Sequence, residues 1–458
     1  MDNSKFDKED LFERTSIPKA VAQLSVPTII GSLVMMLYNL ADTYFVGMLD
    51  DPVQNAAVTL AAPVLLAFNA INNLFGVGCS SMMSRALGKK DYDTVSGSST
   101  FGFWCSIVCG LIFSVGCTVL KGPLLTLLGA DKNTFDVTDG YMFWTVTCGA
   151  IPSILNMVMS YLVRSEGESL HASIGSMSGC ILNMILDPLF ILPQFLGMGS
   201  AGAGCATFIS NCVACAYFFV LIYVKRNKSY VCIDPRKLTI NGRIIKGVFG
   251  VGVPASIQNL LNVTGMTVLN NFAAEYGADA VAAIGIAQKI SMIPMYAAMG
   301  LSQGVMPLIS YNYASGNSSR MKKTISFTGW ISFAFLAAVS VVYYVGAESL
   351  IGAFINNPGV IGYGTGLLRG LCLGTPFLAV DFLAVGVFQA CGMGINSLVF
   401  AIARKIVLEI PALFVLNAVF GLYGLAYAQF CAEFILSICA LIFLRRIFVK
   451  LRCVEEQG

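Results

Sequence analysis

A series of apolar stretches, each long enough to cross a bilayer, constrains the fold of this chain more than any other feature. A transmembrane helix needs about 20 mostly apolar residues. Lipid offers no partner for backbone polar groups, so such stretches cross it as helices. The sequence therefore predicts an all-α polytopic membrane protein with twelve transmembrane helices. The predicted spans are residues 21–46, 55–82, 98–120, 141–163, 172–194, 201–224, 248–273, 280–309, 325–347, 363–389, 398–419 and 421–444.

The composition supports a membrane protein and excludes several other classes. Hydrophobic residues make up 56% of the 458 residues and charged residues only 12%, whereas soluble domains carry about 25% charge. One histidine and fifteen cysteines, mostly single within apolar runs, predict neither a zinc site nor a disulfide framework. We therefore expect no cofactor. A net charge of +3 does not indicate nucleic-acid binding.

Basic residues in the loops predict the orientation in the membrane. If the N-terminus is cytoplasmic, most of the 28 basic residues fall on the cytoplasmic side, as the positive-inside rule requires. Among loop residues, only Lys121 and Lys132 fall clearly on the opposite side. The sequence thus predicts a multi-pass protein of the cell (inner) membrane with both termini in the cytoplasm.

The two halves of the chain resemble each other. Pro27 and Pro254 are 227 residues apart, and so are Phe45 and Phe272. Six spans in each half give the repeats one orientation, which suggests two lobes about an axis along the membrane normal, with a cavity between them. We predict an N-lobe over 1–224 (helices 1–6), a cytoplasmic linker over 225–247, and a C-lobe over 248–458 (helices 7–12 and a basic C-tail).

Several polar side chains lie inside the spans of the first half. Ionisable groups within a membrane are costly and usually functional. Asp42 lies deep in the first span, and Asn183 and Asp187 share one helix face because they are four residues apart. With Asn156 and Thr207 they offer only oxygen ligands, which suit a hard cation or a proton. The alternative is that these groups stabilise the helix packing by hydrogen bonds.

The internal repeat argues for one ion site. At the repeat offset Asp42 corresponds to Leu269, and Asp187 corresponds to Ala412. If the polar cluster only held helices together, both halves would be expected to keep it. The asymmetry therefore predicts an ion site in the N-lobe.

Other polar and adaptable side chains in the spans are weaker candidates. Asp381, Glu433 and Lys289 are charged residues that could face a cavity, and Glu433 and Lys289 could instead pair with each other. Tyr38 and Met292 could line a promiscuous cavity, since methionine-rich surfaces adapt to varied ligands. Lipid contact or core packing is the alternative for these last two.

Five segments resemble the multidrug and toxic compound extrusion (MATE) family. They are "LSVPTIIGSLVMMLYNLADTYFVG", "NMVMSYLVRSEGESLHAS", "ILNMILDPLFI", "GMGSAGAGCATFIS" and "GLSQGVMPLISYNYASGN". The resemblance runs from Ile17 to Arg446, with the motifs in the family's order. It implies a V-shaped fold of two six-helix lobes. It also implies export of organic cations in exchange for Na⁺ or H⁺.

The resemblance also implies roles for particular residues. Pro27 matches the proline that bends the first helix. In another branch of the family an acidic residue lies in span seven, where this chain has Asn262. Its span-ten acid aligns near Leu378, one turn from Asp381. The chain thus resembles the branch that uses its N-lobe. The cation site of that branch, a metal site only if Na⁺ is the coupling ion, falls on Asp42, Asn183, Asp187 and Thr207, with Asn156 nearby.

These observations predict a secondary active multidrug antiporter rather than an enzyme. We expect it to exchange organic cations or drugs for H⁺ or Na⁺, as a monomer in lipid without nucleic acid. One alternative is a flippase for lipid-linked intermediates with the same superfold, which basic residues clustered in the spans would favour. The other is an intramembrane enzyme, which requires paired acids in a loop or a metal motif.

Overall fold

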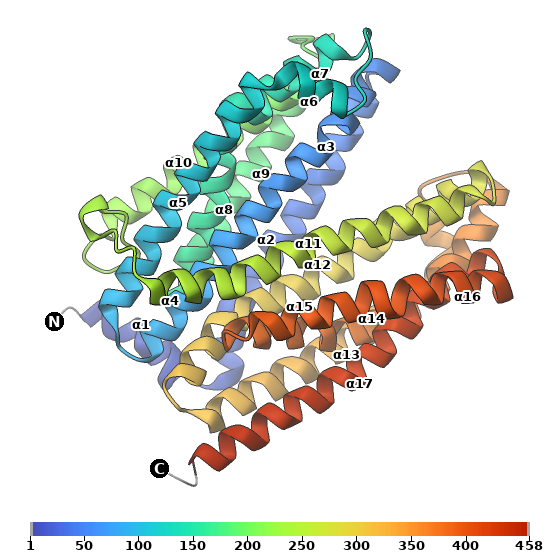
Figure 1. Ribbon diagram of the computed structural model, residues 1–458. Helices are drawn as coiled ribbons and strands as arrows, with labels where there is room; N and C mark the ends of the chain where they lie inside the picture. The colour runs from blue at the N-terminus through green and yellow to red at the C-terminus, as the bar shows by residue number, and fades with distance from the viewer. Residues whose placement is uncertain (1–2, 456–458) are drawn as a thin grey trace. The chain divides into compact units, whose positions relative to one another are not determined.

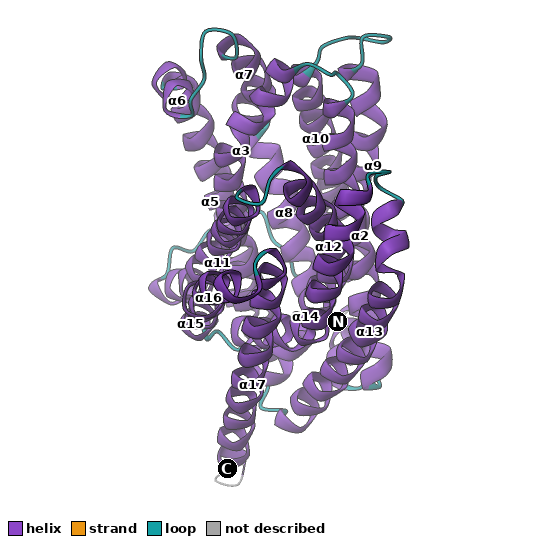
Figure 2. Cartoon of the chain, turned by 90° about the vertical axis from the view of Figure 1, so that its right-hand side faces the viewer, coloured by secondary structure: helices purple, strands orange, loops and turns teal. Residues whose placement is uncertain are grey.

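The computed structural model describes residues 3–455, and within them every regular element is a helix (Figure 2). Figure 1 shows their order along the chain. The first ten helices are α1 (Asn3–Glu13), α2 (Ile17–Gly47), α3 (Pro52–Asn72), α4 (Gly78–Gly88), α5 (Tyr92–Val119), α6 (Lys121–Leu127), α7 (Phe135–Met142), α8 (Ala150–Ser165), α9 (Ser169–Ile191) and α10 (Ser200–Val224). The remaining helices are α11 (Gly242–Ala274), α12 (Ala278–Ala314), α13 (Ser318–Gly352), α14 (Pro358–Ala390), α15 (Gly394–Ile402), α16 (Ile410–Phe420) and α17 (Leu422–Glu455).

Short polar segments set where several of the long helices begin. The side chain of Asp51 accepts the Val53 N–H at 2.9 Å, with Pro52 as the first residue of α3. Asp91 caps α5 in the same way, and Asn357 caps α14. Such side chains satisfy backbone donors that have no partner inside the helix. Proline in the first turn adds a preset backbone angle without losing a hydrogen bond.

Three π-helical segments continue these helices without ending them. η1 (Asn73–Val77) joins α3 to α4, η2 (Phe143–Cys148) extends α7 and is followed by a 49° bend into α8, and η4 (Ala403–Glu409) joins α15 to α16. A short 3₁₀ turn, η3 (Pro235–Lys237), lies between α10 and α11. Single π-turns re-aim side chains and often occur at functional sites.

The predicted all-helical membrane class is confirmed. Within residues 3–455, nine helices are long and apolar enough to cross a membrane, and the bent pair α7–η2 and α8 makes a tenth. Each predicted span overlaps one continuous or bent helical run. The run from 394 to 420 carries three charged side chains, Arg404, Lys405 and Glu409, so it is less apolar than the others. The count of twelve spans stays a prediction.

Contacts between helices divide the chain into two compact units. The first unit comprises Met1–Arg14 and Ile30–Ser256, and the second comprises Thr15–Ile29 and Ile257–Gly458. The division crosses α2 two residues after Pro27 and crosses α11 two residues after Pro254. The predicted linker at 225–247 lies elsewhere, and the predicted lobe boundaries stay a prediction. Each long helix therefore has a proline close to the point where its packing partners change.

Close contacts at glycines explain why the beginning of α2 belongs to the second unit and the beginning of α11 to the first. In the second unit, a Cβ on Gly304 of α12 would lie 2.6 Å from the Ser25 Cα atom of α2. In the first unit, a Cβ on Gly78 of α4 would lie 2.5 Å from the Val248 carbonyl oxygen of α11. Small residues let helix backbones approach closely in membrane proteins. The two contacts occupy corresponding places in the two halves of the chain.

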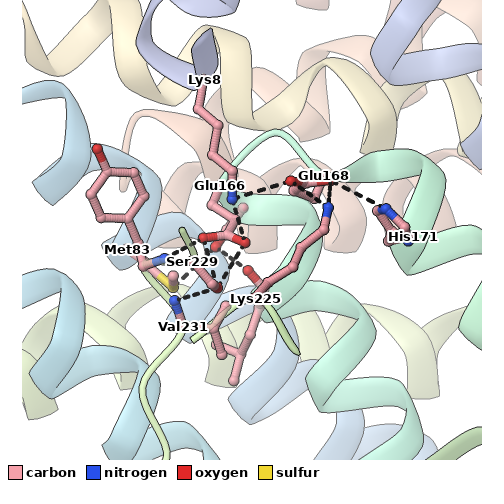
Figure 3. A network of polar contacts seen from close by, with 11 residues as sticks. Lys8, Met83, Glu166, Glu168, His171, Lys225, Ser229 and Val231 are labelled. Atoms are coloured by element: carbon pink, nitrogen blue, oxygen red, sulfur yellow. Dashed lines mark hydrogen bonds and ion pairs between the residues drawn. The ribbon is translucent and has the colours of Figure 1, made fainter. Parts of the chain in front are cut away.

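A buried polar network in the first unit joins segments that are distant in sequence (Figure 3). Lys8 of α1 contacts Glu166 at 2.9 Å and Glu168 at 3.2 Å, both in the turn between α8 and α9. Lys225, which follows α10, contacts Glu168 at 3.0 Å. The Ser229 hydroxyl donates to Glu166 at 2.9 Å. The turn thus holds both the N-terminal helix and the segment after α10.

Candidate functional site

The predicted polar cluster lies within the first unit, on three helices. α2 contributes Asp42, α9 contributes Asn183 and Asp187, and α10 contributes Thr207. Asp187 is fully buried and Asn183 is 2% exposed. Asp42 and Thr207 are partly buried. The structure therefore brings together residues that are up to 165 positions apart in the sequence.

Hydrogen bonds link Asn183, Asp187 and Thr207 directly. The Asn183 amide nitrogen faces the Asp187 carboxylate, with distances of 2.8 and 3.2 Å to its two oxygens. The amide oxygen accepts the Thr207 backbone N–H at 3.0 Å. The reverse orientation of the amide keeps a contact from its nitrogen to the Thr207 hydroxyl but sets its oxygen against the carboxylate. Since two acceptors repel, the first orientation describes the site.

Asp42 is linked to the cluster by electrostatic interaction and not by a hydrogen bond among the described residues. It interacts with Asp187, and both carboxylates interact with the Tyr141 hydroxyl of α7. Tyr38 lies one turn before Asp42 on α2, and its hydroxyl lies near Thr207 and within electrostatic range of Asp42. The sequence did not single out Tyr141, because one tyrosine among 17 carries no signal of its own. Tyr38 is a neighbour of the polar cluster, and its predicted place in a drug cavity stays a prediction.

Asn156 of α8 reaches the cluster through a second asparagine. Its amide nitrogen donates to Asn211 at 3.1 Å, and Asn211 donates to the Thr207 carbonyl at 2.9 Å. The Asn156 amide oxygen is buried and has no hydrogen-bond partner among the described residues. Asn211 was not predicted, although it lies one turn after Thr207 on the same face of α10.

This arrangement suits a proton or an alkali cation. Two carboxylates supply the charge, and the amide, hydroxyl and tyrosine oxygens supply further ligands of the kind that hard cations take. Within residues 3–455, no group of three or more His, Cys, Asp or Glu side chains is placed to hold a metal ion. Two carboxylates in one buried cluster repel each other, which favours the uptake of positive charge.

The candidates in the second half form a different arrangement, within the second unit. Glu433 of α17 is fully buried and pairs with Arg404 of η4, whose Nε donates to it at 2.9 Å. The alternative in which Glu433 pairs with Lys289 is therefore wrong. Lys289 is exposed on α12 and forms no ion pair with the side chains that the structure describes. The sequence did not single out Arg404, because its contact with Glu433, 29 positions away, depends on how two helices pack.

The remaining candidates of the second half lie on three helices of the second unit. Asp381 of α14 is 2% exposed and lines a small pocket with Asn262 of α11 and Arg404. Met292 is partly buried on α12. Asn262 and Asp381 thus meet at one pocket, whereas nothing places Met292 there.

A family model and known relatives now bear on this site. The model for MatE matches residues 27–189 and 254–415, which is most of the chain. The chain belongs to the MATE family. Both matched segments begin at the prolines of α2 and α11, so the family pattern follows the internal repeat. Asp42, Asn183 and Asp187 fall within the first matched segment, whereas Thr207 lies after it.

Relatives and solved structures cover nearly the whole chain. The multidrug export protein MepA of Staphylococcus haemolyticus is 34% identical over 432 residues, covering 94% of this chain and 93% of that protein. A crystal structure of MATE in the straight conformation matches with a TM-score of 0.91 and 26% identity, covering 97% of this chain and 98% of that one. A crystal structure of MATE in the bent conformation matches with a TM-score of 0.89, also at 26% identity, covering 98% of each chain. The MATE fold predicted from the sequence is confirmed.

Proposed function

We propose that this MATE protein exports organic cations or drugs in exchange for H⁺ or Na⁺ by alternating access. The chain is a multi-pass membrane transporter of this family and not an enzyme. Its relative MepA is a multidrug export protein. The observation that carries the proposal is the buried cluster in which Asp42 and Asp187 interact. Burying ionisable side chains inside a membrane costs free energy, and in a transporter such side chains commonly bind the ion that drives transport.

The cluster supplies a mechanism for coupling. A proton or Na⁺ at Asp42 and Asp187 relieves the repulsion between the two carboxylates. Neutralisation also changes how strongly Tyr38 and Thr207 hold α2 against α9 and α10. If drug and ion favour different conformations of the protein, uptake of one promotes release of the other. No ATP is required for such an exchange.

Transport of ethidium tests this function. The purified protein in liposomes is given an H⁺ gradient, an Na⁺ gradient or no gradient, and ethidium movement is followed by fluorescence. We expect transport against the ethidium gradient only when one of the ion gradients is present. Equal rates under all three conditions would contradict an antiporter, and the two gradients separate H⁺ from Na⁺. No ethidium transport under any gradient would point instead to the lipid-linked flippase.

The proposal includes a location and an orientation. The basic loops support a location in the inner cell membrane with both termini in the cytoplasm. The apolar helix surfaces support direct contact with lipid. We also propose that the protein is a monomer and binds no nucleic acid. Arg236 and Asp279 are both exposed. In a background without native cysteines, an impermeant thiol reagent added outside cells should label position 279 and not position 236. The reverse pattern would invert the topology.

Pro27 extends the proposal to a movement of α2. A proline removes one helical hydrogen bond and allows a bend, and in this chain the packing partners of α2 change two residues later. Solved MATE structures include a straight and a bent form. Spin labels on α2 and α10 should show distances that change with pH or Na⁺ in the wild type and stay fixed in Pro27→Ala. Pro254→Ala is the matched control, and identical changes in wild type and Pro27→Ala would mean that Pro27 is a static kink.

A further inference from the structure

A second group of buried charges lies in the second unit, whereas Asp42 and Asp187 belong to the first. Asp381 of α14, Arg404 of η4 and Glu433 of α17 come together there. Asp381 is 2% exposed and Glu433 is fully buried. Both Arg404 Nε and Nη2 donate to the same oxygen of Glu433, Oε1. η4 is π-helical, and this turn carries Arg404 toward α17.

The charges of this group do not balance. Lys405 and Glu409, also on η4, form their own pair at 2.7 Å. The guanidinium of Arg404 is engaged by Glu433. Asp381 is left as a carboxylate for which neither oxygen has a hydrogen-bond partner among the described residues. A buried ionised carboxylate without a partner is strongly disfavoured, so it binds a proton or a cation.

Asp381 faces a space that a proton or water can enter. The pocket beside it is lined by Asp381, Arg404, the amide side chains of Gln258 and Asn262, and apolar residues that include Phe382. The Asp381 carboxyl group is therefore buried and without a hydrogen-bond partner among the described residues, and the residue lines a pocket. The neighbouring helix α12 contributes the Ser302 hydroxyl, but this donates to the Phe382 carbonyl at 2.7 Å and not to Asp381.

Glu433 completes the site. Its Oε2 atom is buried without a partner, and its side chain lies within hydrogen-bonding reach of Asp381. Two carboxylates cannot bond to each other unless one carries a proton, which then serves as the missing donor. The other groups that face the pair are Arg404 and, more distantly, Cys439 of α17, Lys405 and Glu409.

We propose that Asp381 and Glu433 share one exchangeable proton and form a second ion site of this transporter. One proton makes the net charge of Asp381, Glu433 and Arg404 zero, and when shared it gives a partner to Glu433 Oε2 and to one of the two unpaired Asp381 oxygens. Na⁺ fits less well, because the Arg404 guanidinium already occupies Glu433 and repels a second cation. This site differs from the ion site of the MATE branch that has an acidic residue in span seven, because this chain has Asn262 at that position. Its use in transport rests on the proposed function, whereas the shared proton does not.

Infrared difference spectroscopy of the purified full-length protein tests the proton directly. Spectra recorded as the pH is raised should lose the carbonyl band of a protonated carboxyl group. Asp381→Asn should remove one component of that band, and Asp42→Asn should retain the same component. Asp381→Asn breaks no ion pair and keeps an amide donor toward Glu433, so the variant should fold. Glu433→Gln should also remove the component, although it leaves Arg404 unpaired.

Two outcomes would overturn the shared proton. One is an unchanged band in folded Asp381→Asn, with folding judged by size-exclusion chromatography. The other is a component that disappears when Na⁺ is added at constant pH, which would indicate a metal-cation site instead. In liposomes, Asp381→Asn should shift the pH dependence of ethidium efflux. If the wild type transports no ethidium, the proposed function fails, while the infrared result still decides the proton site.

Discussion

Asp42→Asn is expected to abolish ion-driven drug efflux while the protein still folds and inserts. Asparagine has nearly the shape of aspartate, so packing around α2 is preserved. It has no negative charge, so the cluster with Asp187 loses the repulsion that drives uptake of a proton or cation. Ethidium transport in liposomes under an H⁺ or Na⁺ gradient should therefore fall to the rate of protein-free liposomes.

The matched control is a charge removed from a place without a role in coupling. Asp136 of α7 is exposed, and Asp136→Asn should transport ethidium at the wild-type rate. Binding of ethidium to Asp42→Asn, measured by fluorescence anisotropy, should persist, because the cluster binds the ion rather than the drug. Efflux by Asp42→Asn at the wild-type rate would show that coupling does not depend on this cluster.

The sequence could predict the first-half site because its signals are local. Asn183 and Asp187 are one helical turn apart, and Asp42 is an acid within an apolar span. Both patterns indicate polar groups facing the interior of a helix bundle. The comparison of repeats, in which Asp187 matches Ala412, also needed only the sequence. The functional role of these residues stays a proposal.

The sequence could not predict contacts that depend on how helices rotate against each other. Asn211 links Asn156 to Thr207, and Tyr141 lies within electrostatic range of both carboxylates, yet neither has a distinctive spacing. Arg404 and Glu433 are 29 positions apart, on different helices. The π-helical turn η4, which carries Arg404, has no sequence signature in this chain. A pairing of Glu433 with Lys289 was therefore as consistent with the sequence as the pairing with Arg404.

The sequence also could not predict that the chain divides into two compact units close to Pro27 and Pro254. Pro27 and Pro254 were visible as a repeat, and the family resemblance implied a bend of the first helix at Pro27. Where the packing partners change depends on close contacts such as that between Ser25 and Gly304. Those contacts involve small residues that are common throughout membrane helices, so they could not be selected from the sequence.

Replacing Glu166 should cause a large loss of stability. Glu166 is 2% exposed and receives Lys8 at 2.9 Å, the Ser229 hydroxyl at 2.9 Å and the Tyr230 backbone N–H (Figure 3). Glu166→Ala leaves a buried ammonium group and buried donors with fewer partners. Loss of one partner of a buried ion pair costs about 3–5 kcal/mol. We expect the free energy of unfolding, measured by denaturant titration in detergent, to fall by about that amount.

Two comparisons make the stability test specific to the buried network. Arg14 and Asp10 form an exposed pair on α1 at 3.4 Å, and such pairs contribute about 0.2–1 kcal/mol or less. The Arg14→Ala variant should therefore change the free energy of unfolding little.

The dependence of stability on pH gives a second test of the network. Burial opposes the charge on Glu168, but Lys8 and Lys225 outweigh it and hold the pKa of Glu168 below its usual value. Because the pKa is lower in the folded state, its stabilisation is complete above the unfolded pKa and is lost as the pH falls through the folded pKa. Glu168→Gln should remove this part of the dependence of stability on acid pH. If Glu166→Ala lowers the free energy of unfolding no more than Arg14→Ala does, the network does not stabilise the first unit.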